Sequence, residues 1–126
     1  MSIFQQMLGN VTEFAPDKAQ AEFAPILAEG EKVVKAFKLI RDQIILTNLR
    51  IITINKEGLT GSKHFTTTIP YQSIKMFAKE SAGIFDLDAE LRIWLHAESE
   101  PIKWEFSKGV DINEVYRTIS MYVLKK

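Results

Sequence analysis

The chain has 126 residues, of which 46% are hydrophobic and 25% are charged, and it contains no cysteine. This length and composition are typical of one soluble domain, and the lack of cysteine excludes disulfides, thiolate metal sites and a cysteine nucleophile. The 16 basic residues equal the 16 acidic residues, so no net charge attracts the protein to nucleic acid or to an anionic membrane. We therefore expect no nucleic-acid partner.

Residues 1–29 are expected to form a helical extension before the main domain. The first ten residues lack the basic start and long apolar stretch of a secretion signal, so a cytoplasmic protein is expected. Apolar residues here recur at the spacing of one helix face and predict a short helix that ends near Gly9. They are Ile3, Phe4, Met7 and Leu8. A second helix is predicted to begin with Asp17 as its N-cap and to end or kink by Pro25.

From Lys32 onward the chain becomes rich in Val, Ile, Thr, Phe and Trp, with short turn signals at regular intervals. Connections this short exclude crossover helices, so the strands are predicted to pair as an antiparallel meander. Seven strands are predicted, at 32–40, 43–48, 50–56, 62–69, 73–80, 88–97 and 101–107.

The last predicted element is a helix. Asp111, followed three residues later by Glu114, forms the acidic variant of a capping box. The apolar stripe of this helix consists of Ile112, Val115, Ile119, Tyr122 and Val123. Because this stripe needs an apolar surface to cover, the sequence predicts a mainly β fold. It consists of a seven-stranded, bent antiparallel sheet capped by a C-terminal helix, with short N-terminal helices in addition.

Several short runs occur in a characteristic order. They are Gly30-Glu31-Lys32-Val33, Ile40-Arg41-Asp42, Leu46-Thr47-Asn48-Leu49-Arg50, Gly58 with Gly61, Ile69-Pro70-Tyr71, Glu80-Ser81-Ala82-Gly83 and Phe85-Asp86-Leu87-Asp88-Ala89-Glu90-Leu91. Together they resemble the bacterial pleckstrin-homology (PH) domain family over about residues 28 to 124. The resemblance implies a PH-like barrel, here placed at 30–126. It also implies a tendency to form ring-shaped homo-oligomers and no established enzymatic activity.

Two neighbouring predicted strands are apolar on both faces. Ile44 and Leu46 lie on one face of the strand at 43–48, and Ile45 lies on the other. In the next strand Ile51 likewise points away from Ile52 and Ile54. A sheet with one face in water alternates apolar and polar residues, so something is expected to cover the outer face. The cover is predicted to be either the N-terminal helices or a neighbouring subunit.

A second sign of an interface lies in the strand at 88–97. Trp94 and Arg92 are predicted to point outward with His96, and such residues are enriched in protein interfaces. The alternative is that Trp94 packs under the N-terminal segment. Asp86 and Glu90 belong to an acidic run that is either a solvated hairpin or half of an ion-paired subunit contact. The predicted interface residues are Trp94, Arg92, Ile45, Ile51, Asp86 and Glu90.

Anion binding is the function that a PH-like fold first suggests. The candidates Lys35, Lys38 and Arg41 do not converge, because alternate residues of a strand face opposite sides, and Asp42 would repel a phosphate. No catalytic residue, metal site or cofactor is predicted, since the two histidines, His64 and His96, stand in no known motif.

The sequence therefore predicts a non-catalytic cytoplasmic domain that self-associates into a ring. Such an assembly would serve as a scaffold or would recognise another protein. A membrane-surface or anionic-lipid module that uses Lys35, Lys38 and Arg41 is the alternative, which the balanced charge does not favour.

Overall fold

The computed structural model describes residues 7–81 and 89–125, and these contain eight strands. The chain divides into two compact units. The central unit is Glu13–Pro70, and the terminal unit joins Met1–Thr12 to Tyr71–Lys126.

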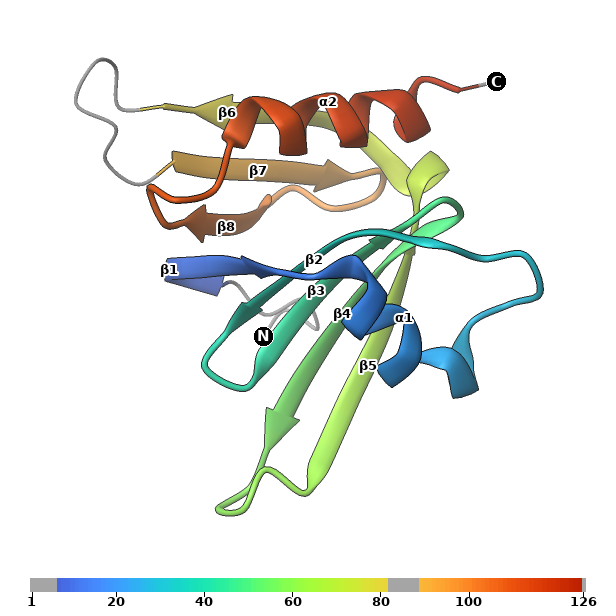
Figure 1. Cartoon of the computed structure of the whole chain (residues 1–126). Helices are drawn as coiled ribbons and strands as arrows, with labels where there is room; N and C mark the ends of the chain where they lie inside the picture. The colour runs from blue at the N-terminus through green and yellow to red at the C-terminus, as the bar shows by residue number, and fades with distance from the viewer. Residues whose placement is uncertain (1–6, 82–88, 126) are drawn as a thin grey trace. The chain divides into compact units, whose positions relative to one another are not determined.

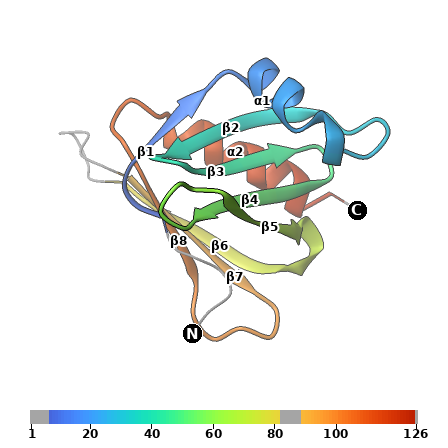
Figure 2. The ribbon, with the colours of Figure 1, turned by 90° about the horizontal axis from the view of Figure 1, so that it is seen from below.

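The central unit contains two short helices and an antiparallel sheet. Its elements are α1 (Pro16–Glu22), the 3-10 helix η1 (Ala24–Ile26), β2 (Val33–Leu39), β3 (Asp42–Thr47), β4 (Arg50–Glu57) and β5 (Lys63–Pro70). The four strands lie side by side in chain order, each antiparallel to the next (Figure 2). The prediction of an antiparallel meander is confirmed here, and the strand ends agree to within about two residues.

The core of the central unit explains why β3 and β4 are apolar on both faces. Ile45 and Ile52 lie directly opposite each other and cluster with Ala19 of α1. Full burial of one such isoleucine contributes about 1.5–3 kcal/mol. The outer face is therefore covered, as the strand pattern predicts, and in this structure the cover is the α1 helix of the same chain.

The terminal unit contains four strands and the longest described helix. Its elements are β1 (Met7–Phe14, which runs on into the central unit), the 3-10 helix η2 (Tyr71–Ser73), β6 (Ile74–Glu80), β7 (Ala89–Leu95), β8 (Ile102–Phe106) and α2 (Ile112–Val123). The strand order is β1-β8-β7-β6, with α2 along β6 and β7 (Figure 1). The β6–β7 and β7–β8 pairs are antiparallel, whereas β1 pairs with β8 in parallel.

The prediction of a short helix that ends near Gly9 is wrong for the residues that the structure describes, because Met7 begins strand β1. Met7 pairs with Trp104 and Val11 pairs with Phe106, and all four side chains are buried. Gly9 has a positive φ of 83°, which interrupts the strand where its register shifts. Tertiary pairing with β8 therefore overrides the local helical spacing. Ile3 and Phe4 lie outside the described residues.

The N-cap prediction for the next helix is wrong by two residues. Ala15 is the N-cap of α1, with extended backbone angles, and Pro16 occupies the first helical turn. Proline suits that position because its missing N–H would have no helical partner there. Asp17 lies one residue further on, in the first turn, where a negative charge is favourable.

The capping prediction for α2 is confirmed. One carboxylate oxygen of Asp111 accepts hydrogen bonds from the backbone N–H groups of Asn113 and Glu114, at 3.0 and 3.2 Å. From the predicted stripe, Val115 and Ile119 are buried, and the ring of Tyr122 stacks on Tyr71 with centroids 5.2 Å apart.

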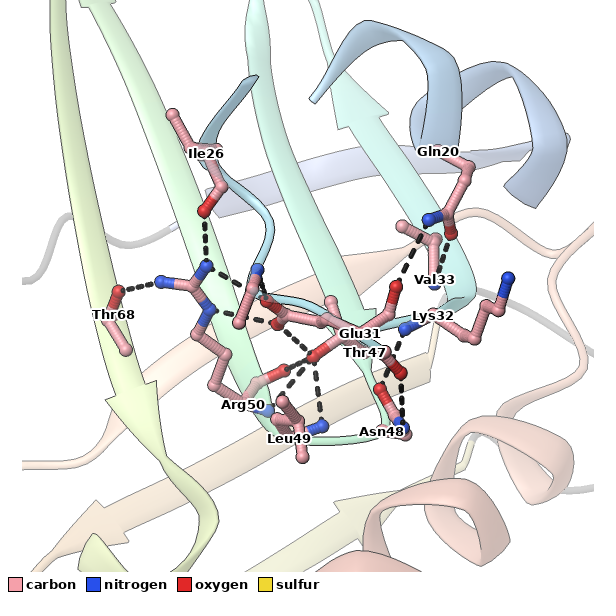
Figure 3. A network of polar contacts seen from close by, with 12 residues as sticks. Gln20, Ile26, Glu31, Lys32, Val33, Thr47, Asn48, Leu49, Arg50 and Thr68 are labelled. Carbon is pink, nitrogen blue, oxygen red and sulfur yellow. Dashed lines mark hydrogen bonds and ion pairs between the residues drawn. The ribbon is translucent and has the colours of Figure 1, made fainter. Parts of the chain in front are cut away.

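A buried carboxylate fixes the segment between η1 and β2 to the turn between β3 and β4 (Figure 3). The side chain of Glu31 has no exposed surface. Its Oε2 atom accepts hydrogen bonds from Thr47 Oγ1 at 2.6 Å and Arg50 Nε at 2.9 Å. Its Oε1 atom accepts from the Ala28 N–H at 2.8 Å and Arg50 Nη2 at 3.0 Å.

The guanidinium of Arg50 extends this network to β5 and η1. Nη1 donates to Thr68 Oγ1 at 2.9 Å, and Nη2 donates to the backbone oxygen of Ile26 at 2.8 Å. Arg50 therefore joins η1, the Glu31 segment, β4 and β5 through one planar group.

The protonation of Glu31 follows from these contacts. Burial alone would raise the pKa of Glu31, but the hydrogen bonds from Arg50, Thr47 and Ala28 and the charge of Arg50 outweigh it and lower the pKa. Since the folded-state pKa lies below the ordinary value of 4.5, the stabilisation is complete above that pH. It is lost as the pH falls through the folded-state pKa.

We expect Glu31→Gln to lower the free energy of unfolding at pH 7 by about 2–4 kcal/mol, because Arg50 keeps its charge without its ion partner. Urea denaturation over a pH series would measure this, and the variant should lose less stability than the original chain below pH 4.5. Glu29→Gln is the control, since Glu29 is exposed. Equal stability of Glu31→Gln and the original chain would contradict the assigned role.

Candidate interaction surfaces

The outward face of the β6–β7–β8 sheet carries the predicted interface tryptophan. Phe77 and Ile93 lie opposite each other on the inner face, where the ring of Tyr116 from α2 lies 5.2 Å from that of Phe77. Trp94 and Met76 form the neighbouring cross-strand pair and therefore face the opposite side. Met76 is 50% exposed and Trp94 is half-buried.

Charged residues border the Trp94–Met76 pair on the same face. Arg92 forms ion pairs with Glu90 of its own strand and with Glu80 of β6, the latter at 3.1 Å. The hydrogen bond to Glu90 raises the pKa of Arg92 above its ordinary value, so the guanidinium remains charged. Glu90 thus has a basic partner within the chain.

Two predicted interface residues are separated from this face. Ile45 and Ile51 are fully buried in the chain itself and offer no surface to another molecule in this structure. Asp86 lies outside the described residues. The structure therefore brings Trp94, Arg92 and Glu90 together, and their part in self-association stays a prediction.

The three predicted anion-binding residues have separate partners. Lys35 Nζ lies 2.9 Å from Glu13 Oε2, and Lys38 Nζ lies 5.8 Å from the centroid of the Phe14 ring. Arg41 Nη1 donates to the backbone oxygen of Gly58 at 3.0 Å. Each of the three cations thus has a partner of its own within the chain, and their part in anion binding stays a prediction.

Two exposed apolar residues at hairpin tips were not predicted. Ile40, in the β2–β3 turn, is 93% exposed and has a positive φ of 55°, which is rare for a β-branched residue. Leu59, in the β4–β5 turn, is fully exposed. The hydrogen bond from Arg41 to Gly58 joins the two turns. Ile40 stands next to residues typical of a turn, which could have indicated its exposure. The strand predicted at 32–40 instead includes it as its last residue.

A cavity of about 320 Å³ opens beside α1 and η1 in the central unit. Its lining is mainly apolar and comes from both helices and from β4 and β5. The lining residues are Glu22, Phe23, Pro25, Ile26, Ile54, His64 and Thr66. No sequence pattern identified it, because it depends on where α1 and η1 lie on the sheet.

The described residues give no support for a metal site. They contain no group of three or more His, Asp or Glu side chains that could hold an ion. His64 and His96 are both exposed and lie in different units. Over the same residues, no helix has the length and apolar character needed to cross a bilayer.

Comparison with known proteins identifies the family. Residues 2–123 match the family described as bacterial PH domain. The chain belongs to the bacterial PH domain family. It is 42% identical over 121 residues to the uncharacterized protein YjqA of Bacillus subtilis, covering 95% of this chain and 97% of YjqA. It is 35% identical over 98 residues to the uncharacterized protein YozO of the same organism, covering 78% of this chain and 83% of YozO.

Solved structures agree with this bacterial PH assignment. A DUF1696-family protein with a pleckstrin-homology domain, from Shewanella loihica PV-4, is 37% identical to this chain. The two structures superpose with a TM-score of 0.83, covering 92% of this chain and 99% of the other. A pleckstrin homology domain from Shewanella amazonensis SB2B is 40% identical, with a TM-score of 0.72, covering 93% of this chain and 94% of that domain. The predicted PH-like fold is thereby confirmed, with eight described strands instead of seven.

Proposed function

We propose that this bacterial PH domain is a non-catalytic cytoplasmic module that assembles into a ring-shaped homo-oligomer. The ring would act as a scaffold or recognise another protein. The observation that carries the proposal is the outward Trp94–Met76 pair, on the sheet face opposite to α2. A large aromatic side chain beside an exposed methionine is the composition typical of an interface centre.

The charges around this pair allow it to be buried in a contact between subunits. Arg92, Glu90 and Glu80 are already ion-paired, so they can border an apolar contact without leaving an unpaired buried charge. A head-to-tail contact between unlike surfaces closes into a ring when its rotation allows. This agrees with the ring-forming tendency that the family resemblance implies.

Trp94→Glu is expected to reduce the molar mass in solution to that of a single chain, because a carboxylate would have to be desolvated in the contact. Size exclusion with light scattering at tens of micromolar protein measures the mass. The thermal unfolding midpoint should fall only modestly, since Trp94 lies on an outer face and part of its side chain is already exposed to water.

Met121→Glu is the matched control, because Met121 is an exposed apolar residue on α2. It should leave the mass unchanged. A single-chain mass for the unaltered protein at the same concentration would refute ring assembly. A full-size assembly of Trp94→Glu would place the contact elsewhere.

The second candidate function is docking to an anionic membrane surface, and the exposed tips Ile40 and Leu59 favour it. Both are large apolar residues at joined turns of one sheet. Lys38, Arg41, Lys56 and Lys63 flank these turns, against Asp42 and Glu57. An apolar tip with a local basic excess suits the interface between headgroups and acyl chains.

For this function, the double variant Ile40→Asn and Leu59→Asn should bind vesicles at least about tenfold more weakly. Asparagine tolerates the positive φ at residue 40, so the variant should be no less stable than the original chain. Cosedimentation with vesicles of phosphatidylcholine and phosphatidylglycerol in equal parts measures binding at low and high salt. No binding of the original chain at low salt would exclude this function.

A further inference from the structure

The outer edge of β5 is open in the part of the chain that the structure describes. β5 ends the strand order of the central unit, with β4 on its only paired side. In an antiparallel pair, alternate residues direct their N–H and C=O groups away from the partner strand. Protein edges are usually blocked by lysine, proline or a bulge. Here Lys63 and Pro70 stand at the two ends and leave 64–69 between them unblocked.

The sequence of this edge suits a strand partner. Residues 64–69 read His-Phe-Thr-Thr-Thr-Ile, which is rich in β-branched and aromatic residues. Five of these six residues are exposed or half-exposed, and Phe65 is 48% exposed. An added extended chain would therefore meet accessible backbone groups and would bury side chains that now face water.

The cavity beside α1 and η1 adjoins the same edge. His64 and Thr66 lie on one face of β5 and line it together with Phe23, Pro25 and Ile26. Ile26 is 45% exposed, so the apolar wall can be reached from outside. A volume of about 320 Å³ is at the lower end for ligand sites and suits one or two side chains of a peptide.

A carboxylate stands at one side of the cavity. The Glu22 carboxylate lines it and accepts a hydrogen bond from Gln43 Nε2 at 3.3 Å. Gln43 lies directly opposite Ile54, another lining residue, and its own Oε1 atom is buried with no hydrogen-bond partner among the described residues. The Glu22 carboxylate that lines the cavity is complemented by a cationic donor such as Lys or Arg.

We propose that the β5 edge and its cavity bind an extended peptide segment of another protein. The segment adds a strand to β5 and places an apolar side chain against Phe23 and Ile26. A Lys or Arg side chain at an alternate position, on the same face, pairs with Glu22. The proposal specifies the recognition of another protein proposed above and rests on it. Ring assembly uses the Trp94 face, so the two can fail separately.

Selection from a random peptide library on the full chain tests this proposal. The displayed segment has eight residues, the length of β5. Enriched peptides are expected to carry an apolar and a basic residue at alternate positions. Their binding, measured by fluorescence anisotropy, should weaken at least about tenfold for Ile26→Glu and for Glu22→Lys. Glu29→Lys, on the following exposed segment, should bind like the original chain.

Two further measurements separate this mode from nonspecific binding. Reversing the basic residue of the peptide to Glu should restore binding to Glu22→Lys, and N-methylation of the peptide backbone should abolish binding to the original chain. No enrichment, equal binding to Ile26→Glu, or failure of the charge exchange would overturn the proposal. A lower molar mass of Ile26→Glu with no selected peptide would assign the edge to a second copy and would also overturn it.

Discussion

The central unit depends on the ion pair between Glu31 and Arg50. Glu31 has four hydrogen-bond donors around a fully buried carboxylate, and Arg50 carries the connection on to η1 and β5. An apolar contact could hold the segment after η1 in several positions, whereas a bidentate pair fixes both distance and orientation. By holding η1 and the segment after it against β4 and β5, this buried ion pair helps to set the position of the helices that cover the outer face and line the cavity beside β5.

The sequence predicted most of the fold because its signals were local. Seven strands follow from alternation and turn residues, and the start of α2 follows from Asp111 with Glu114. The errors lie where a distant partner decides the conformation. Met7 belongs to a run with the spacing of a helix face, but its pairing with Trp104 of β8 places it in a strand. No window along the sequence contains both partners.

The candidate surfaces likewise include features that follow from the local sequence and features that depend on distant parts of the chain. The outward position of Trp94 and Arg92 follows from alternation in one strand, so it could be predicted. The fact that α1 rather than a second molecule covers Ile45 could not be predicted, because both arrangements satisfy the same apolar pattern. The cavity beside β5 requires the positions of two helices and two strands at once. The positive φ of Ile40 at a turn could not be predicted, because isoleucine rarely adopts a positive φ and its presence does not indicate one.

The parallel pairing of β1 with β8 has a consequence for synthesis on the ribosome. Residues 13–70 are contiguous, so the central unit can form its meander as soon as they have emerged. Met7 must wait for Trp104, from which most of the chain length separates it, and closing so long a loop is slow. The β1–β8 pairing within the terminal unit is thus expected to form late, after the contiguous central unit.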